Sequence, residues 1–151
     1  MRAIGIDLGS RRIGVALSDS DGRLALPYEV VTRCGDRRRD HRRLAELVTE
    51  TEAEVVVVGL PYSLDGTLGP TARRYLKEAD ELRATVGVPV ETYDERLTTV
   101  TAERSLREMQ MTADARRRVV DKVAAAVMLQ SWLDHRAGRD DPRASEFHPS
   151  D

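Results

Sequence analysis

The stretch IGIDLGSRRIGVAL, from Ile4 to Leu17, decides how this chain begins to fold. It reads as two apolar strands joined by a tight turn, and one carboxylate, Asp7, interrupts the first strand where it meets the glycine of the turn. Burying a carboxylate among Ile and Leu is costly unless a partner compensates its charge. Asp7 could simply cap its turn by accepting hydrogen bonds from the N–H groups of Gly9 and Ser10. Alternatively, it serves chemistry at the end of the strand.

Composition sets the class of protein. The chain has 151 residues, of which 40% are hydrophobic and 33% charged, which indicates one globular domain. No apolar run reaches the ~20 residues of a membrane span, and the strand pattern begins at once, so we expect neither a membrane segment nor a signal peptide. Cys34 is the only cysteine, which favours a cytoplasmic protein. The net charge of −2 excludes a strongly basic nucleic-acid footprint, although nearly all the positive charge is arginine.

Three antiparallel strands are predicted first, over 2–8, 13–18 and 23–31, with the hairpin signal DSDG before the third. Pro27 suggests that the third strand lies at an edge or carries a bulge. The apolar period then changes to that of a helix. The remaining pattern predicts helices over 36–51, 71–85, 98–109 and 114–136, and strands over 54–61 and 87–95.

This order predicts an α/β protein with a mixed five-stranded sheet and helices on both faces. The run of valines in 54–61 is typical of a central parallel strand that is covered on both faces. We expect one domain over 1–136, followed by a polar, disordered tail over 137–151.

Three further acids, Asp94, Glu95 and Asp121, occupy positions that a purely structural role explains poorly. Asp94 and Glu95 end the last predicted strand, and because side chains alternate along a strand, only one of them can face Asp7. The sequence by itself does not say which. Asp121 lies about two turns into the last helix, beyond the reach of the helix dipole, on the face that also carries Trp132. Carboxylates that converge repel one another unless cations sit among them, and oxygen ligands select Mg²⁺ or Mn²⁺, which suits phosphoryl chemistry.

Four stretches carry a family resemblance: DLGSRRIGVALSD, VVVVGLPYSLDG, YDERLTT and VDKVAAAVMLQSWL. In this order they resemble the signature motifs of the YqgF family, also called RuvX, and they cover the chain to about Leu133. The resemblance implies a ribonuclease H-like fold and a metal-dependent nuclease. The family is associated with 5′-end maturation of pre-16S rRNA, and an older description is Holliday junction resolvase.

The resemblance also implies roles for individual residues. It carries over three acids as the catalytic and metal-binding set, namely Asp7, Glu95 and Asp121. It places Arg12 and Arg96 at motif positions from which they could contact phosphate.

Arginines elsewhere suggest how a substrate strand is held. The arginines at 116–118 precede Asp121 by about one turn, and a track from them past Asp121 toward Arg96 would guide a single strand across the acids. Arg116 and Arg117 are the predicted substrate-binding residues of this group. Aromatic side chains for base stacking are few, which favours recognition of the nucleic-acid backbone. We therefore expect single-stranded or flanking RNA to be preferred over a four-way DNA junction.

Other classes of protein remain open on sequence grounds. One is an actin-like ATPase or sugar kinase, in which a strand with Asp-x-Gly also binds phosphate, but such proteins need two domains of this type. Another is a non-catalytic nucleic-acid-binding module, which would have no need of paired Mg²⁺. The sequence leaves open whether the chain is a monomer or a homodimer.

Overall fold

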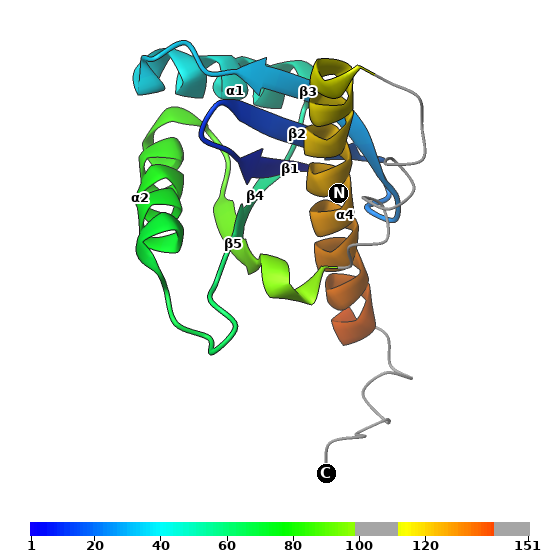
Figure 1. Ribbon diagram of the computed structural model, residues 1–151. Coiled ribbons are helices and arrows are strands. Elements are labelled where there is room, and N and C mark those ends of the chain that lie inside the picture. The colour runs from blue at the N-terminus through cyan, green and yellow to red at the C-terminus, as the bar shows by residue number, and fades with distance from the viewer. Residues whose placement is uncertain (99–111, 141–151) are drawn as a thin grey trace.

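Five strands form one mixed sheet in the order β3–β2–β1–β4–β5 (Figure 1). The computed structural model describes residues 1–98 and 112–140. The strands are β1 (Ala3–Leu8), β2 (Arg12–Ser18), β3 (Ala25–Thr32), β4 (Val55–Leu60) and β5 (Val90–Asp94). The first three pair antiparallel, whereas β4 lies parallel to both β1 and β5. The predicted fold class is confirmed.

Two details of the sheet follow directly from the sequence. β3 is an edge strand, and its pairing with β2 shifts register between Val15 and Ala16, next to Pro27, so Pro27 lies both at an edge and at an irregularity. Proline has no N–H to donate to a neighbouring strand, and it is tolerated there because an edge or an irregularity does not require that hydrogen bond. β4 is buried along its whole length between two parallel neighbours, as its run of valines predicts.

Helices follow the predicted order. They are α1 (Arg37–Thr51), α2 (Pro70–Thr85), the single 3₁₀ turn η1 (Glu95–Leu97) and α4 (Ala113–Asp140). Asp36 caps α1 by accepting from the N–H groups of Arg38 and Arg39, and Pro70 stands at the start of α2, where its missing N–H costs nothing.

The last predicted helix and the tail differ in part from the structure. α4 continues through 137–140, four residues into the stretch expected to be disordered. Its one glycine there, Gly138, lowers helix stability by only about 1 kcal/mol, so the helix tolerates it. The helix predicted over 98–109 lies, from residue 99 on, outside the described residues, as does 141–151.

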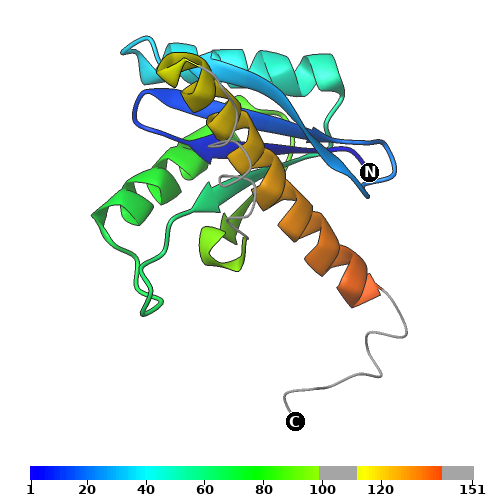
Figure 2. The same cartoon turned by 45° about the vertical axis from the view of Figure 1, so that its right-hand side comes forward.

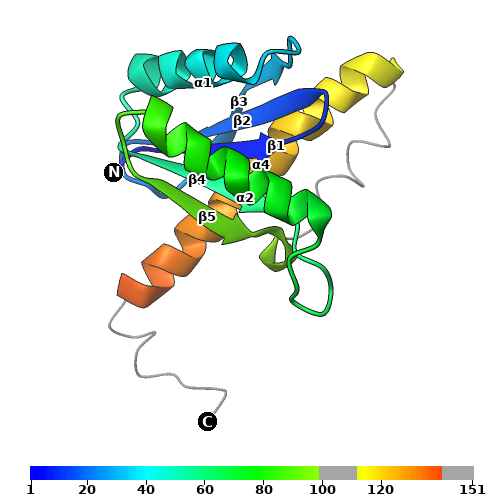
Figure 3. The same ribbon diagram turned by 90° about the vertical axis from the view of Figure 1, so that its left-hand side faces the viewer.

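The sheet has a two-helix face and a one-helix face. Figure 3 shows α1 and α2 in front of the sheet with α4 behind it, and Figure 2 shows α4 crossing the strands obliquely. Alternation along β1 sends Ile4 and Ile6 into the core beneath α1 and α2, and Ala3 into the core beneath α4. Small residues let α4 approach closely: a Cβ on Gly5 would lie 2.8 Å from the Cβ of Leu129. None of the helices within the described residues is long and apolar enough to cross a bilayer.

Candidate active site

Asp7 lies near the end of β1, and the residue beside it on each neighbouring strand is a glycine. It follows the alternation of Ala3, so its side chain is on the α4 face of the sheet. Its partner on β2 is Gly14. On the other side, the β1–β4 pairing ends at Ile6 and Val58, so Gly59 is the next residue of β4 beside Asp7. Neither neighbouring strand therefore places a side chain against Asp7, which leaves space for groups from elsewhere.

Gly14 brings Asp121 to the site. The backbone of α4 passes so close to this glycine that an added Cβ would lie 2.1 Å from the carbonyl oxygen of Asp121. Any side chain at position 14 would push the helix away from the sheet, because Cβ atoms do not approach backbone at that distance. The close packing of α4 on β2 thus places Asp121 directly over the cross-strand neighbour of Asp7.

Gly59 admits Glu95 in the same way. A Cβ on Gly59 would lie 2.6 Å from the Oε1 atom of Glu95, whose side chain lies across the glycine and hydrogen-bonds to Asp7. Glu95 is held in turn by η1, in which the Thr98 hydroxyl donates to the Glu95 carbonyl oxygen at 2.7 Å. Of the two acids at the end of β5, Glu95 is the one that contacts Asp7, while Asp94 pairs with Arg96. That Glu95 is the metal ligand remains a prediction.

The electrostatics of Asp7 reflect this crowding. Burial, the hydrogen bond with Glu95, and repulsion from the carboxylates of Glu95 and Asp121 raise the pKa of Asp7 to about 8. At neutral pH and without a bound cation, Asp7 therefore holds a proton. Among the described residues, no three Asp, Glu, His or Cys side chains are close enough to form a ready-made metal cluster. The tightly associated pair is Asp7 with Glu95, and Asp121 stands next to it.

Arg12 accounts for the position of the Asp121 carboxylate. Its Nε atom donates to Oδ2 of Asp121 at 2.6 Å, and both side chains are about one quarter exposed. Arg12 is therefore at the site, as predicted, but its Nε contacts an acid of that site. Its two terminal amino groups make no hydrogen bond with a described residue, and they keep donors that could contact a substrate phosphate.

Arg96 holds a loop. Its Nε donates to both oxygens of Asp94 at 3.0–3.1 Å, and a terminal nitrogen lies 3.3 Å from the carbonyl oxygen of Ser63. The guanidinium also stacks over Tyr62, 5.6 Å from the ring centre. These contacts join the end of β5 to the 61–69 loop after β4, so the contacts of Arg96 in this structure are structural ones.

Arg116 and Arg117 lie in the first turns of α4. Arg117 is exposed, whereas the Nε of Arg116 is buried and has no hydrogen-bond partner among residues 1–98 and 112–140. A pocket beside Arg12 is lined by Arg118 and not by Arg116 or Arg117. Arg118 is three residues before Asp121 and hence on the same helix face. The predicted role of Arg116 and Arg117 in substrate binding remains a prediction.

The geometry agrees with what comparison with known proteins shows. The family model described as "RuvX: Holliday junction resolvase" matches residues 1–135. The chain belongs to the RuvX family. Relatives named "Putative pre-16S rRNA nuclease" include one from Mycobacterium sp. (strain KMS), 54% identical over 89% of this chain and 80% of its own length. Another, from Rhodococcus opacus (strain B4), is 51% identical over 90% and 79% of the two chains.

A solved structure confirms the fold of this RuvX chain. RuvC of T. thermophilus, in complex with a Holliday junction substrate, superposes with a TM-score of 0.57 over 91% of this chain and 96% of RuvC. The two are 19% identical, so the likeness establishes a shared ribonuclease H-like fold. Membership of the RuvX family, with relatives named as nucleases at more than 50% identity, identifies the chain as a nuclease.

Sequence reasoning missed the two glycines that build this RuvX site. Gly14 and Gly59 fall within the strands predicted over 13–18 and 54–61, and an isolated glycine within a strand pattern is a signal of close approach by another group. That signal says that something comes near. It does not say that Asp121 comes to one glycine and Glu95 to the other.

Proposed function

We propose that this chain is a divalent-metal-dependent nuclease that cleaves phosphodiester bonds in 5′-end processing of pre-16S rRNA. The observation that carries the proposal is the state of Asp7. It is crowded by Glu95 and Asp121, and its pKa is raised to about 8. A proton there does what a cation would do in the working enzyme, because either one relieves the repulsion. The names of the relatives support pre-16S rRNA as the substrate.

The donor set fits Mg²⁺ or Mn²⁺. Asp7, Glu95 and Asp121 offer only carboxylate oxygens, which suit hard cations that retain several waters. In this proposal Asp7 and Glu95 are the principal ligands, with Asp121 beside them. A bound cation would supply an activated water and stabilise the leaving oxygen.

The chain's other residues hold these acids in place. Gly14 and Gly59 fix how closely Asp121 and Glu95 can come to Asp7. Arg12 restrains Asp121 through Nε, and in this proposal it offers its terminal amino groups to the phosphate that lies over the acids. Guanidinium groups suit phosphate oxygens because they present two parallel donors.

A cleavage assay tests the proposal. Wild-type protein is incubated with a 5′-extended 16S precursor RNA in Mg²⁺, Mn²⁺ or Ca²⁺, beside Asp7→Asn and a control, Asp21→Asn. Asp21 is an exposed acid of the β2–β3 hairpin. We expect cleavage in Mg²⁺ and Mn²⁺, little in Ca²⁺, and loss of cleavage only in Asp7→Asn. Full activity in Asp7→Asn, or in chelator, would refute the metal site. Binding without any cleavage would indicate a non-catalytic module.

A four-way DNA junction is the second substrate in the same assay, because the family model is described as a junction resolvase. Resolution needs two sites and hence a dimer. Symmetric paired nicks in the junction, with tighter binding than to the RNA, would assign resolvase activity instead. Under the rRNA proposal the protein works in the cytoplasm, and a monomer suffices.

A further inference from the structure

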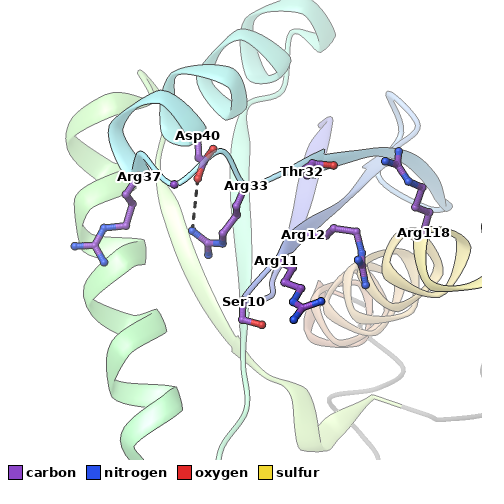
Figure 4. Close-up of a pocket in the computed structure, with 9 residues that line it drawn as sticks. Ser10, Arg11, Arg12, Thr32, Arg33, Arg37, Asp40 and Arg118 are labelled. Carbon is purple, nitrogen blue, oxygen red and sulfur yellow. Dashed lines mark ion pairs between the residues drawn. The ribbon is translucent and has the colours of Figure 1, made fainter. Parts of the chain in front are cut away.

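An arginine-lined pocket adjoins the acids. Its volume is about 590 Å³, and it is bounded by the β1–β2 turn, the end of β3, the start of α1 and the first turns of α4 (Figure 4). The lining residues are Ser10, Arg11, Arg12, Thr32, Arg33, Gly35, Arg37, Asp40 and Arg118. Five are arginines and one is an acid, and none is aromatic or aliphatic.

We propose that this pocket binds backbone phosphates of the substrate strand beside the scissile position. The proposal rests on the nuclease function above and adds where the strand runs. Arg12 carries it: this residue lines the pocket and also pairs with Asp121, so the pocket and the acids share a wall. A strand whose scissile phosphate lies at the acids therefore has neighbouring phosphates within reach of the pocket.

The charges of the pocket are only partly compensated. Arg33 is neutralised by Glu78, which it meets through two hydrogen bonds of 2.9 Å, and Arg37 pairs with Glu81 at 2.8 Å. Arg11 differs from them, because it is exposed and makes no ion pair or hydrogen bond through its side chain with any residue of 1–98 or 112–140. In Figure 4, Arg12 lies between Arg11 and Arg118, while Arg37 points away toward α2.

Hydrogen bonds of Arg33 hold the backbone of the pocket together. The Nε atom of Arg33 donates to the carbonyl oxygen of Gly9 at 2.7 Å, and its backbone N–H donates to the carbonyl oxygen of Arg11 at 2.9 Å. Arg33 thus ties the β1–β2 turn, which follows Asp7, to the end of β3. Arg11 is carried by a turn whose backbone is held at both ends, so the turn itself need not be ordered when the Arg11 side chain binds a phosphate.

The chemistry of the lining selects backbone over base. Phosphate oxygens are recognised by arginine and by serine and threonine hydroxyls, and all three occur here. Bases are held by stacking on aromatic rings, which this pocket lacks. We expect binding that depends little on sequence. The strand runs from the acids toward Arg11 and Arg118, on the Arg12 side of Asp121. The track expected from the sequence joined the arginines at 116–118 to Arg96 and did not include Arg11.

Binding without cleavage tests the pocket independently of catalysis. A fluorescent single-stranded RNA is titrated in chelator against Asp7→Asn protein that carries either Arg11→Ala or Arg23→Ala. Arg23 is an exposed arginine of the β2–β3 hairpin, at the opposite end of β2, so both variants lose one charge. We expect Arg11→Ala to weaken binding roughly three- to tenfold for unrelated sequences and to flatten the salt slope by about one, while Arg23→Ala changes neither.

Neutral methylphosphonate linkages locate the contact. One such linkage is moved along the RNA, and we expect one position at which it weakens binding to protein with Arg11 but not to Arg11→Ala. The proposal is overturned if Arg11→Ala behaves like Arg23→Ala, if both weaken binding equally, if no linkage position couples to Arg11, or if no strand binds. Competition by AMP that matches the strand in affinity would assign the pocket to free nucleotides and also overturn it.

The two proposals can fail separately. Coupling to Arg11 in a protein that never cleaves with Mg²⁺ or Mn²⁺ would leave the pocket established and refute the nuclease mechanism. Metal-dependent cleavage by the wild type, together with unchanged RNA binding by the Arg11→Ala variant, would support the nuclease function and refute phosphate binding in the pocket.

Discussion

At the scale of single residues, the site depends on an acid that is stabilised by very little in the apo protein. Asp7 has glycines on both neighbouring strands, Gly14 and Gly59, and its side chain hydrogen-bonds to another acid, Glu95. This arrangement costs folding free energy when no cation is bound. Function and stability therefore oppose each other at Asp7.

Replacing Asp7 by Asn should stabilise the apo protein in a pH-dependent way. The pKa of Asp7 is about 8 when folded and 3.8 in the reference state, so the folded state holds the extra proton between these values. The wild type then loses stability as pH rises from about 4 toward 8. We expect a gain for Asp7→Asn on the order of 2–4 kcal/mol at pH 7 that vanishes below pH 4. Urea unfolding in chelator across this range measures it, and a gain that is independent of pH would contradict the assignment.

Gly59→Ala should impair catalysis more than folding. The added methyl group would meet the Glu95 carboxyl group at 2.6 Å and displace it from Asp7. A misplacement of about 1 Å costs on the order of a hundredfold in rate. The matched control is Gly87→Ala, because an added Cβ there would meet no atom of the described residues within 4 Å, apart from its chain neighbours. Single-turnover cleavage compares the two variants, and equal rates would show that Glu95 tolerates being moved.

At the scale of elements, a buried ionic network links the two-helix face to the site. Glu78 of α2 accepts from Arg33, and it lies 2.8 Å from the Nε2 atom of His41 in α1. Burial alone would raise the pKa of Glu78, but its hydrogen bonds to His41 and Arg33 bring it down to about 2. Since Arg33 also holds Gly9, α1 and α2 are joined through this network to the turn that follows Asp7.

Removing Glu78 should therefore be costly. Glu78→Ala removes the partner of the buried His41 and both hydrogen bonds of the Arg33 guanidinium, which keeps only the longer 4.0 Å ion pair with Asp40. We expect a loss of about 3–5 kcal/mol at pH 7. The folded pKa lies below the reference value of 4.5, so the stabilisation is fully present above pH 4.5 and declines as pH falls toward 2. Glu81→Ala on the same helix breaks a more exposed pair with Arg37 and should cost at most about 1 kcal/mol. Urea unfolding of both variants measures the difference, and an equal loss of unfolding free energy in the two would show that the buried network adds no more stability than the exposed pair.

At the scale of the whole molecule, opposite charges are concentrated side by side in a protein of net charge −2. The acids lie on the α4 face where β1 and β4 end, and the arginine pocket adjoins them through Arg12. Cations and phosphates can therefore bind next to each other without a large basic surface.

Metal binding should appear in the stability of the whole chain. A cation that binds only the folded state stabilises it by about 1.4 kcal/mol when its concentration is ten times Kd. We expect Mn²⁺ to raise the thermal midpoint of wild type and Asp21→Asn in a concentration-dependent manner, and to leave Asp7→Asn unchanged. Thermal unfolding at several Mn²⁺ concentrations checks this. The same increase in all three proteins would show that the ion binds elsewhere.

The sequence by itself determined the local structure. Periods of two and 3.6 residues, the DSDG hairpin signal and Pro27 at an edge predicted the order of strands and helices, because these signals act through neighbouring residues. The order of strands and helices then implied the sheet, since few connections between such elements are physically allowed. The conspicuous acids Asp7 and Asp121 could also be recognised, because an acid in an apolar pattern is costly wherever it folds.

Only the tertiary structure decided which groups meet. Asp94 and Glu95 differ in the face they occupy, and the face that matters depends on where α4 packs, which no local pattern specifies. The pairing of Arg12 with Asp121 joins residues 109 positions apart in the chain. The pocket likewise combines arginines from three separate parts of the sequence. Contacts of this kind depend on the packing of whole elements. In the sequence, the only trace of that packing is a glycine at positions 14 and 59, where a side chain would block the approach of Asp121 and Glu95.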